Sequence, residues 1–187
     1  MENRIARKGK TYDLVLTGIF AALIFVVTYA THFPFPTMGI GPKILVHLGD
    51  AALYLSVIMI GTRRGTIAAA IGMGLFDILS PYIIWAPVTI IAKAGMAFIA
   101  GLFINGNKRE GKSVKFNIIG SIIAGIYMIV MYWIGGAIIT ILTTKNVGIV
   151  ASLIANTEGI PGNIIQVVLG IVVAVPLGAA INKVKKR

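Results

Sequence analysis

The sequence predicts an all-α integral membrane protein, a bundle of six transmembrane helices with both termini in the cytoplasm. The 187 residues are 57% hydrophobic and only 12% charged, and their mean hydropathy of +0.92 is well above that of water-soluble domains. Six apolar runs have the length of helices, and the basic residues gather in alternate connections between them. At about 20 residues per span, the chain has room for six helices in a single domain over residues 1–187.

The apolar runs end at charged residues or at clusters of glycine and proline, and these boundaries define the spans. They lie at about residues 13–32, 46–60, 66–80, 87–104, 117–143 and 161–181. The first run follows a basic N-terminus, as in a signal peptide, but it is too long and no small-residue cleavage site follows, so we expect a retained helix. The second and third runs are short, and we expect them to be tilted, bent or enclosed by protein.

The connections after the first, third and fifth runs are rich in proline and glycine. Both residues form helices poorly, and surface connections of this kind often close over binding sites. These three connections are therefore candidate lids, all on the same side of the membrane.

The distribution of lysine and arginine tests the number of spans, because cytoplasmic connections are enriched in both residues. With six spans, 14 of the 17 basic residues fall on one side: Arg4, Arg7, Lys8, Lys10, Arg63, Arg64, Lys108, Arg109, Lys112, Lys115, Lys183, Lys185, Lys186 and Arg187. Five spans would move the basic C-terminus outside, so the pattern favours six. It also explains the net charge of +11 without nucleic acid as a partner.

Five polar or ionisable residues lie inside the spans, where a charge costs several kcal/mol: Asp50, Asp77, Lys93, Asn163 and Gln166. With spans of alternating direction, all five fall in the outer half of the membrane. Lys93, for example, lies about 9 Å into the fourth span at 1.5 Å per residue, and it can pair with Asp50 or Asp77. The alternative is a charge pair that only locks helices together. The convergence of the five predicts a binding site that opens to the outside.

Aromatic residues with polar tips fall at a similar depth: Tyr54, Tyr82, Trp85, Tyr132 and Trp133. Such rings stack on planar heterocycles, although each alone is also typical of the aromatic belt at a membrane surface. His47 lies three residues before Asp50, and we expect it to hydrogen-bond a ligand or to cap the mouth of the pocket. No metal site is expected, since the chain has two histidines and no cysteine.

Missing motifs argue against an enzyme. The stretch from Gly101 to Lys108 is superficially similar to a phosphate loop, but Asn107 separates the glycine from the lysine and no serine or threonine follows. The Gly-x-Ser-x-Gly and His-Glu-x-x-His motifs of serine and zinc hydrolases are absent from the sequence. We therefore expect a binding or transport protein that has no cofactor and does not hydrolyse ATP.

The first span carries three small residues, Gly18, Ala21 and Ala22. Gly18 and Ala22 stand four apart, a spacing that lets a second helix approach closely. The pattern predicts either an internal helix contact or a contact with the helix of a partner protein.

The stretch between about residues 47 and 101 resembles a known family. Its segments are Gly49-Asp50-Ala51-Ala52, Gly61-Thr62-Arg63-Arg64-Gly65, Gly74-Leu75-Phe76-Asp77 and the run from Trp85 to Gly101. They are similar to the substrate-binding S component of energy-coupling factor (ECF) vitamin transporters, and most similar to the branch for hydroxymethylpyrimidine or pyridoxine-type substrates. The fifth and sixth spans match only in general character.

The resemblance implies a six-helix protein of a bacterial plasma membrane that binds a small heterocyclic vitamin or precursor near the outer face, under a lid from the loop after the first span. It implies a membrane scaffold protein and two cytoplasmic ATPases as partners. Members usually have an Ala-x-x-x-Ala-like pattern in the first span that meets the scaffold, and Gly18-x-x-x-Ala22 is the nearest equivalent here.

Three other functions fit the same residues. The chain can be the S component for another vitamin, such as riboflavin. It can be a stand-alone ion- or proton-coupled carrier that uses Asp50, Asp77 and Lys93 as a relay. It can also be a purely structural membrane partner, in which case the buried charges serve assembly alone.

Overall fold

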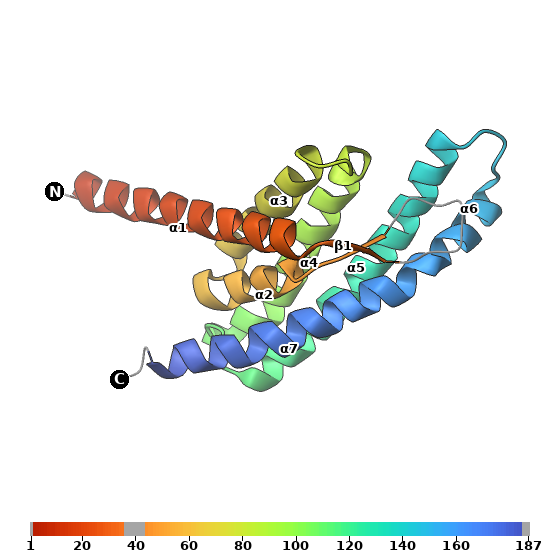
Figure 1. Ribbon diagram of the computed structural model, residues 1–187. Helices are drawn as coiled ribbons and strands as arrows, with labels where there is room; N and C mark the ends of the chain where they lie inside the picture. Colours follow the sequence, from red (N-terminus) through yellow and green to blue (C-terminus); the bar gives the residue numbers. More distant parts are fainter. Residues whose placement is uncertain (1, 36–43, 185–187) are drawn as a thin grey trace.

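The computed structural model describes residues 2–35 and 44–184, and this part of the chain is mostly helical (Figure 1). Its elements are α1 (Glu2–Thr31), β1 (Phe33–Phe35), β2 (Ile44–Val46), α2 (Gly49–Ile60), α3 (Thr62–Ile78), α4 (Ala86–Asn105), α5 (Val114–Thr143), α6 (Ile149–Ala155) and α7 (Ile160–Val184). Single 3-10 turns cover Ile83–Trp85, Gly106–Lys108 and Asn156–Gly159.

Among the described residues, four helical segments are long and apolar enough to cross a membrane: Gly9–Thr31, Ile83–Lys108, Val114–Thr143 and Ile149–Val184. The remaining long helices, α2 with 12 residues and α3 with 17, are those that the sequence predicts to be short. The apolar runs therefore located the helices well, whereas six complete crossings stay a prediction.

Helix α2 lies at the centre of the bundle and packs against α1, α3, α4 and α7. All of its residues except Leu55 and Met59 are buried, which explains how so short a helix is accommodated. Around it, α3 packs against α1 and α4, α4 against α5, and α5 against α7. The predicted enclosure of the second span by protein is confirmed.

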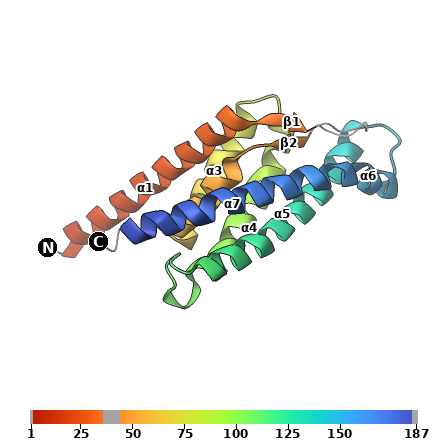
Figure 2. The same cartoon turned by 60° about the horizontal axis from the view of Figure 1, so that its bottom comes forward.

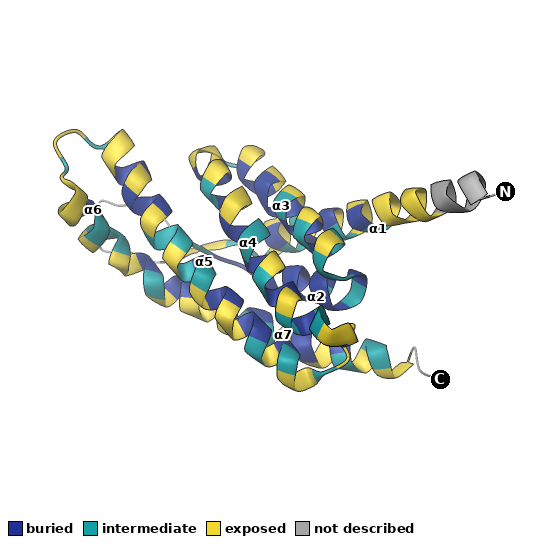
Figure 3. Cartoon of the chain, turned by 180° about the vertical axis from the view of Figure 1, so that it is seen from behind, coloured by how far each residue is buried: buried dark blue, intermediate teal, exposed yellow. Residues whose placement is uncertain are grey.

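Apolar side chains also cover the outside of the bundle, where exposed residues follow the outer faces of the long helices (Figure 3). Ile19 of α1, Ile126 of α5 and Val172 of α7 are each more than half exposed. A water-soluble helix would place polar residues there. This surface suits a protein that is surrounded by lipid.

Both termini lie at one end of the bundle, and α6 lies at the opposite end (Figures 1 and 2). The end that carries the termini also contains the turn between α2 and α3 and the connection between α4 and α5, with their arginines and lysines. We call it the basic end.

The structure departs from the predicted elements between the first and second spans. Phe33–Phe35 and Ile44–Val46 form an antiparallel two-stranded sheet in which Phe33 pairs with Val46, whereas a loop was expected. Proline in the first segment disfavours helix, and short apolar segments that approach each other satisfy their main-chain groups by pairing. Residues 36–43 of the predicted lid lie outside the described residues.

Two further features go beyond the predicted spans. α1 begins at Glu2, so the helix extends N-terminally of the span predicted from about residue 13. The connection between the last two spans is not a simple loop, since it contains α6 and a 3-10 turn. A seven-residue helix is too short to give a reliable periodic signal.

Candidate functional site

A cavity lies at the end of the bundle opposite the termini, which we call the cavity end. It has an empty volume of about 640 Å³, which includes its open mouth. Its walls come from β2, the last turns of α3, the 3-10 turn Ile83–Trp85, the C-terminal half of α5, the turn that follows α6, and the first turns of α4 and α7. Eight of the ten predicted ligand-binding residues line it: His47, Asp77, Tyr82, Trp85, Tyr132, Trp133, Asn163 and Gln166.

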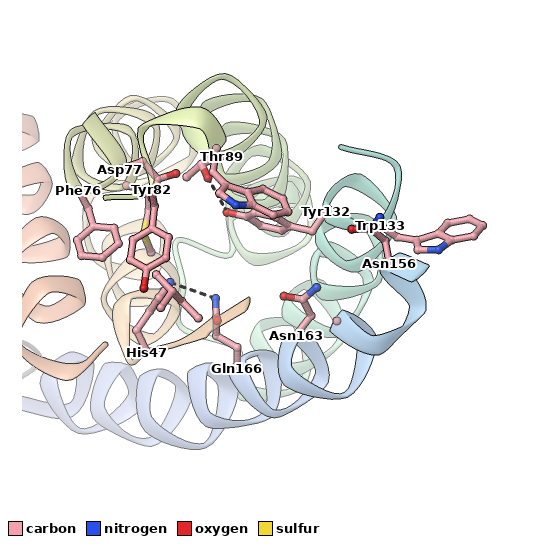
Figure 4. A pocket seen from close by; sticks show the side chains of 14 residues that line it. His47, Phe76, Asp77, Tyr82, Thr89, Tyr132, Trp133, Asn156, Asn163 and Gln166 are labelled. Atoms are coloured by element: carbon pink, nitrogen blue, oxygen red, sulfur yellow. Dashed lines mark hydrogen bonds between the residues drawn. The ribbon is translucent and has the colours of Figure 1, made fainter. Parts of the chain in front are cut away.

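Aromatic pairs form two of the walls (Figure 4). The rings of Phe76 and Tyr82 lie with centroids 6.4 Å apart at an interplanar angle of 17°. The rings of Trp85 and Tyr132 lie 5.9 Å apart at 46°. Flat apolar faces on two sides of a cavity favour a planar ligand, because aromatic groups pack best in offset stacks or edge to face.

Trp133 differs from the other predicted aromatic residues. Its ring extends away from the other labelled side chains (Figure 4), and its indole N–H donates to the carbonyl of Leu153 at 2.9 Å. Trp133 therefore connects α6 to α5 at the edge of the cavity.

Tyr54, predicted at a similar depth, is fully buried and donates to the Ser121 carbonyl at 2.7 Å, so it belongs to the helix packing.

The two predicted ligand-binding residues that do not line the cavity form an ion pair. Lys93 Nζ lies 2.6 Å from Asp50 Oδ1, and both side chains are 0% exposed. Depth along the spans allowed Lys93 to pair with either Asp50 or Asp77, and the structure pairs it with Asp50. The Lys93 ammonium also lies 5.3 Å from the centre of the Tyr132 ring, a distance at which a cation is attracted to an aromatic face.

Gln166 connects this ion pair to the cavity. Its Nε2 donates to Asp50 Oδ2 at 3.1 Å, and the same residue lines the cavity. Asp50 is thereby bonded through both carboxylate oxygens, one to Lys93 and one to Gln166.

Two buried acceptor atoms at the cavity have no hydrogen-bond partner within the described chain: Asp77 Oδ2 and Gln166 Oε1. Burial of a polar atom without a partner costs about 1–3 kcal/mol, so such atoms are expected where a ligand completes the bonding. Nearby, Tyr132 Oη donates to Thr89 Oγ1 at 3.0 Å.

His47 is held at the floor of the cavity by the start of α2. Its Nδ1 accepts the main-chain N–H of Gly49 at 3.2 Å, and its Nε2 lies 3.4 Å from Gln166 Nε2. A side chain at position 49 would clash with Thr28, Met73 and His47 itself, so glycine is required for this arrangement.

Six lining residues were not predicted as site residues: Leu45, Met73, Phe76, Thr89, Asn156 and Gly159. Most are apolar or weakly polar and give no signal above that of ordinary helix packing. Asn156 is the exception, since it is polar and donates to Thr140 Oγ1 at 3.0 Å. Within the described residues, no group of three His, Cys, Asp or Glu side chains is arranged to bind a metal.

The small residues of α1 face in two directions. Gly18 and Ala22 are exposed, and a Cβ atom at Gly18 would meet nothing within 4 Å. Ala21 is buried, and its carbonyl oxygen would lie 2.6 Å from a Cβ at Gly72 of α3. Ala21 was predicted to contact a partner protein together with Gly18 and Ala22, but in the structure it lies in the contact between α1 and α3.

The sequence model of one family, described as ECF-type riboflavin transporter, S component, matches residues 8–183. The chain belongs to this family. The resemblance to S components is thereby confirmed, whereas the hydroxymethylpyrimidine or pyridoxine branch finds no support in the match. A comparison with curated proteins gives no match.

Solved structures share the fold, and two of those compared are described as S components. An S component of a bacterial ECF transporter superposes with a TM-score of 0.69 at 22% identity, covering 95% of this chain and 99% of the other. The S component for biotin from an ECF-type ABC transporter gives a TM-score of 0.62 at 21% identity, with 91% and 92% covered. ThiT from Listeria monocytogenes gives 0.62 at 19% identity, with 94% and 97% covered.

Proposed function

We propose that this S component is the substrate-binding subunit of an ATP-driven importer and captures a flat heterocyclic vitamin in the cavity described above. The observation that carries the proposal is the combination of two aromatic pairs with unpaired buried acceptors around one space.

The cavity is proposed to open to the outside, with six spans and both termini in the cytoplasm. Arg63, Arg64 and Lys112 lie at the basic end, and basic connections face the cytoplasm. The chain lacks cysteine, so single cysteines report on topology directly. A cysteine at Thr157 should react with an impermeant maleimide on intact cells, and one at Ser113 should be protected. The opposite labelling pattern would invert the orientation.

Riboflavin is the substrate that we favour. The family match supports it, and a three-ring flavin offers more planar surface to the two aromatic walls than a single ring does. The second candidate is a single-ring vitamin, hydroxymethylpyrimidine or pyridoxine. The motif between residues 47 and 101 and the donors and acceptors at the cavity support it, but such a ring would contact less of the two aromatic walls.

The test is equilibrium binding to the purified protein in lipid nanodiscs, with riboflavin, hydroxymethylpyrimidine and pyridoxine as the panel. Riboflavin fluorescence should be quenched on binding, and calorimetry serves for the other two. We expect a submicromolar Kd for riboflavin and at least 100-fold weaker binding of the others. The reverse preference would select the single-ring candidate, and no binding of any of the three would refute the proposed function.

Energy for import is proposed to come from separate proteins, a membrane scaffold and two cytoplasmic ATPases. The exposed face of α1 around Gly18 and Ala22 is the proposed scaffold contact, because small residues four apart let helices approach closely. Vesicles that contain this chain alone should bind riboflavin and accumulate none. Uptake by such vesicles that depends on an ion gradient would instead identify a stand-alone carrier.

A further inference from the structure

The Asp50–Lys93 ion pair is fully buried and lies behind the cavity wall. Neither residue lines the cavity, so neither contacts a ligand there directly. A buried ion pair is weak evidence for stability, because the cost of removing two charges from water can exceed their attraction. A gain in stability therefore does not explain why this pair lies directly behind the site.

The carboxylate of Asp50 determines how the Gln166 carboxamide is oriented. An ionised carboxylate only accepts hydrogen bonds, and Lys93 occupies its Oδ1 at 2.6 Å. Oδ2 therefore requires a donor, which is Gln166 Nε2 at 3.1 Å. A rotation of the amide by 180° would place its carbonyl oxygen against the carboxylate, where two acceptors repel.

Because the amide nitrogen of Gln166 is bonded to Asp50, its carbonyl oxygen remains available as an acceptor. Gln166 Oε1 is buried and without a partner in the described chain, and Gln166 itself is 2% exposed. On the other side of the cavity, Asp77 of α3 is 5% exposed and its Oδ2 is likewise unpartnered (Figure 4). The cavity thus presents two acceptors from separate walls.

We propose that Asp50 and Lys93 are positioning residues that hold the Gln166 carbonyl toward the cavity, where it and Asp77 accept hydrogen bonds from the vitamin. The inference rests on the proposed function and adds a ligand class. The ligand is a flat heterocycle that carries N–H or O–H donors at two separate edges. A ligand with acceptors at both positions is rejected, because it would leave all four atoms unpaired.

The orientation of Gln166 can be observed without any ligand. Gln166 is the only glutamine in the chain, so protein labelled with side-chain ¹⁵N-glutamine gives one amide pair in an NMR spectrum. We expect one of its two protons to be shifted downfield and protected from solvent exchange by the bond to Asp50. The double variant Asp50→Leu with Lys93→Met should lose both features. Retention of both features in the double variant would overturn the inference.

Binding distinguishes positioning from a purely structural role. Removal of both partners of a buried ion pair is often neutral for stability, so the double variant should fold, and its melting temperature checks this. Its Kd for riboflavin should rise at least tenfold, the scale of one buried hydrogen bond. The matched control Ser56→Ala lies on the same helix and bonds only the Leu53 carbonyl, so it should bind as the native protein does. A folded double variant with native affinity would overturn the inference.

The loss of riboflavin affinity in the double variant should arise only from the changed orientation of Gln166. Gln166→Met in the native background should raise the Kd by a similar factor, and the same change in the double variant should raise it no further than twofold. Independent losses that multiply would contradict positioning. If the native protein binds no vitamin of the panel, the proposed function fails, and the amide spectrum still decides whether Asp50 orients Gln166.

Discussion

The two ends of the bundle use the same types of polar side chain for different purposes. At the basic end, the amides of Asn117 and Asn182 both donate to the Gly111 carbonyl, at 2.9 and 3.1 Å, and Asn105 donates to the Val57 carbonyl at 3.1 Å. At the cavity end, Gln166 lines the cavity and donates to another side chain, the Asp50 carboxylate. A polar residue in an apolar span thus indicates a binding site only when its partners are other side chains around a cavity.

The largest effect is expected from breaking the ion pair at the cavity end. Lys93→Met leaves the Asp50 carboxylate buried and without its cation, and removal of one partner of a buried pair costs about 3–5 kcal/mol. Denaturant titration in mixed micelles should show a loss of unfolding free energy of this size. Lys93→Met combined with Asp50→Leu should recover most of it, and a stable single variant would mean that the pair contributes little.

At the basic end, stability should depend on the backbone conformation at Gly111 rather than on the charged side chains. Gly111 has φ +70°, and a Cβ there would collide with the Ile58 carbonyl, so Gly111→Ala should lower stability by about 1–3 kcal/mol. Gly148→Ala is the control, since a Cβ at that position would meet nothing within 4 Å. Riboflavin affinity of folded Gly111→Ala should equal that of the native protein. A selective loss of affinity would show that the two ends are coupled.

A smaller effect is expected from one aromatic wall of the cavity. Tyr82→Ala removes the ring stacked on Phe76, and we expect the Kd for riboflavin to rise about tenfold, which corresponds to about 1.4 kcal/mol. The control Tyr29→Ala removes a 59% exposed ring of α1 and should leave the Kd unchanged. Equal effects of the two variants would argue against stacking at the cavity.

The smallest effect on the isolated protein is expected on the outer face of α1. Gly18→Ala adds a methyl group where nothing lies within 4 Å, so stability and ligand affinity should change by no more than about 0.5 kcal/mol. Vitamin uptake in cells that also contain the scaffold and ATPases should fall, most strongly for the bulkier Gly18→Leu. Native uptake by Gly18→Leu would exclude this face as the scaffold contact.

Most of the helical layout was predictable because apolar runs and charge patterns carry it directly. The fourth span was expected at 87–104 and α4 is Ala86–Asn105; the fifth was expected at 117–143 and α5 is Val114–Thr143. The hairpin and α6 were not predictable, since each is shorter than the window over which periodicity can be recognised.

The site was predictable in its polar members for a physical reason. A residue such as Asp77 is costly in an apolar span unless it has a partner or a function, so polarity alone drew attention to it. The pairing of Lys93 was not predictable, because depth along a span does not fix the direction in which a side chain points. Phe76 and Thr89 were missed because residues of these types are equally common in helix contacts and lipid-facing surfaces.

The lengths of two helices on opposite sides of α4 have a consequence for the surrounding bilayer. At 1.5 Å per residue, the 17 residues of α3 extend about 26 Å and the 30 residues of α5 extend about 45 Å, against a hydrocarbon thickness of about 30 Å. If α3 crosses the bilayer, as the six-span prediction has it, lipids beside it would meet a hydrophobic belt that is too short, and those beside α5 would meet one that is too long. Such an uneven mismatch would favour a tilted protein and a locally thinned bilayer along α3.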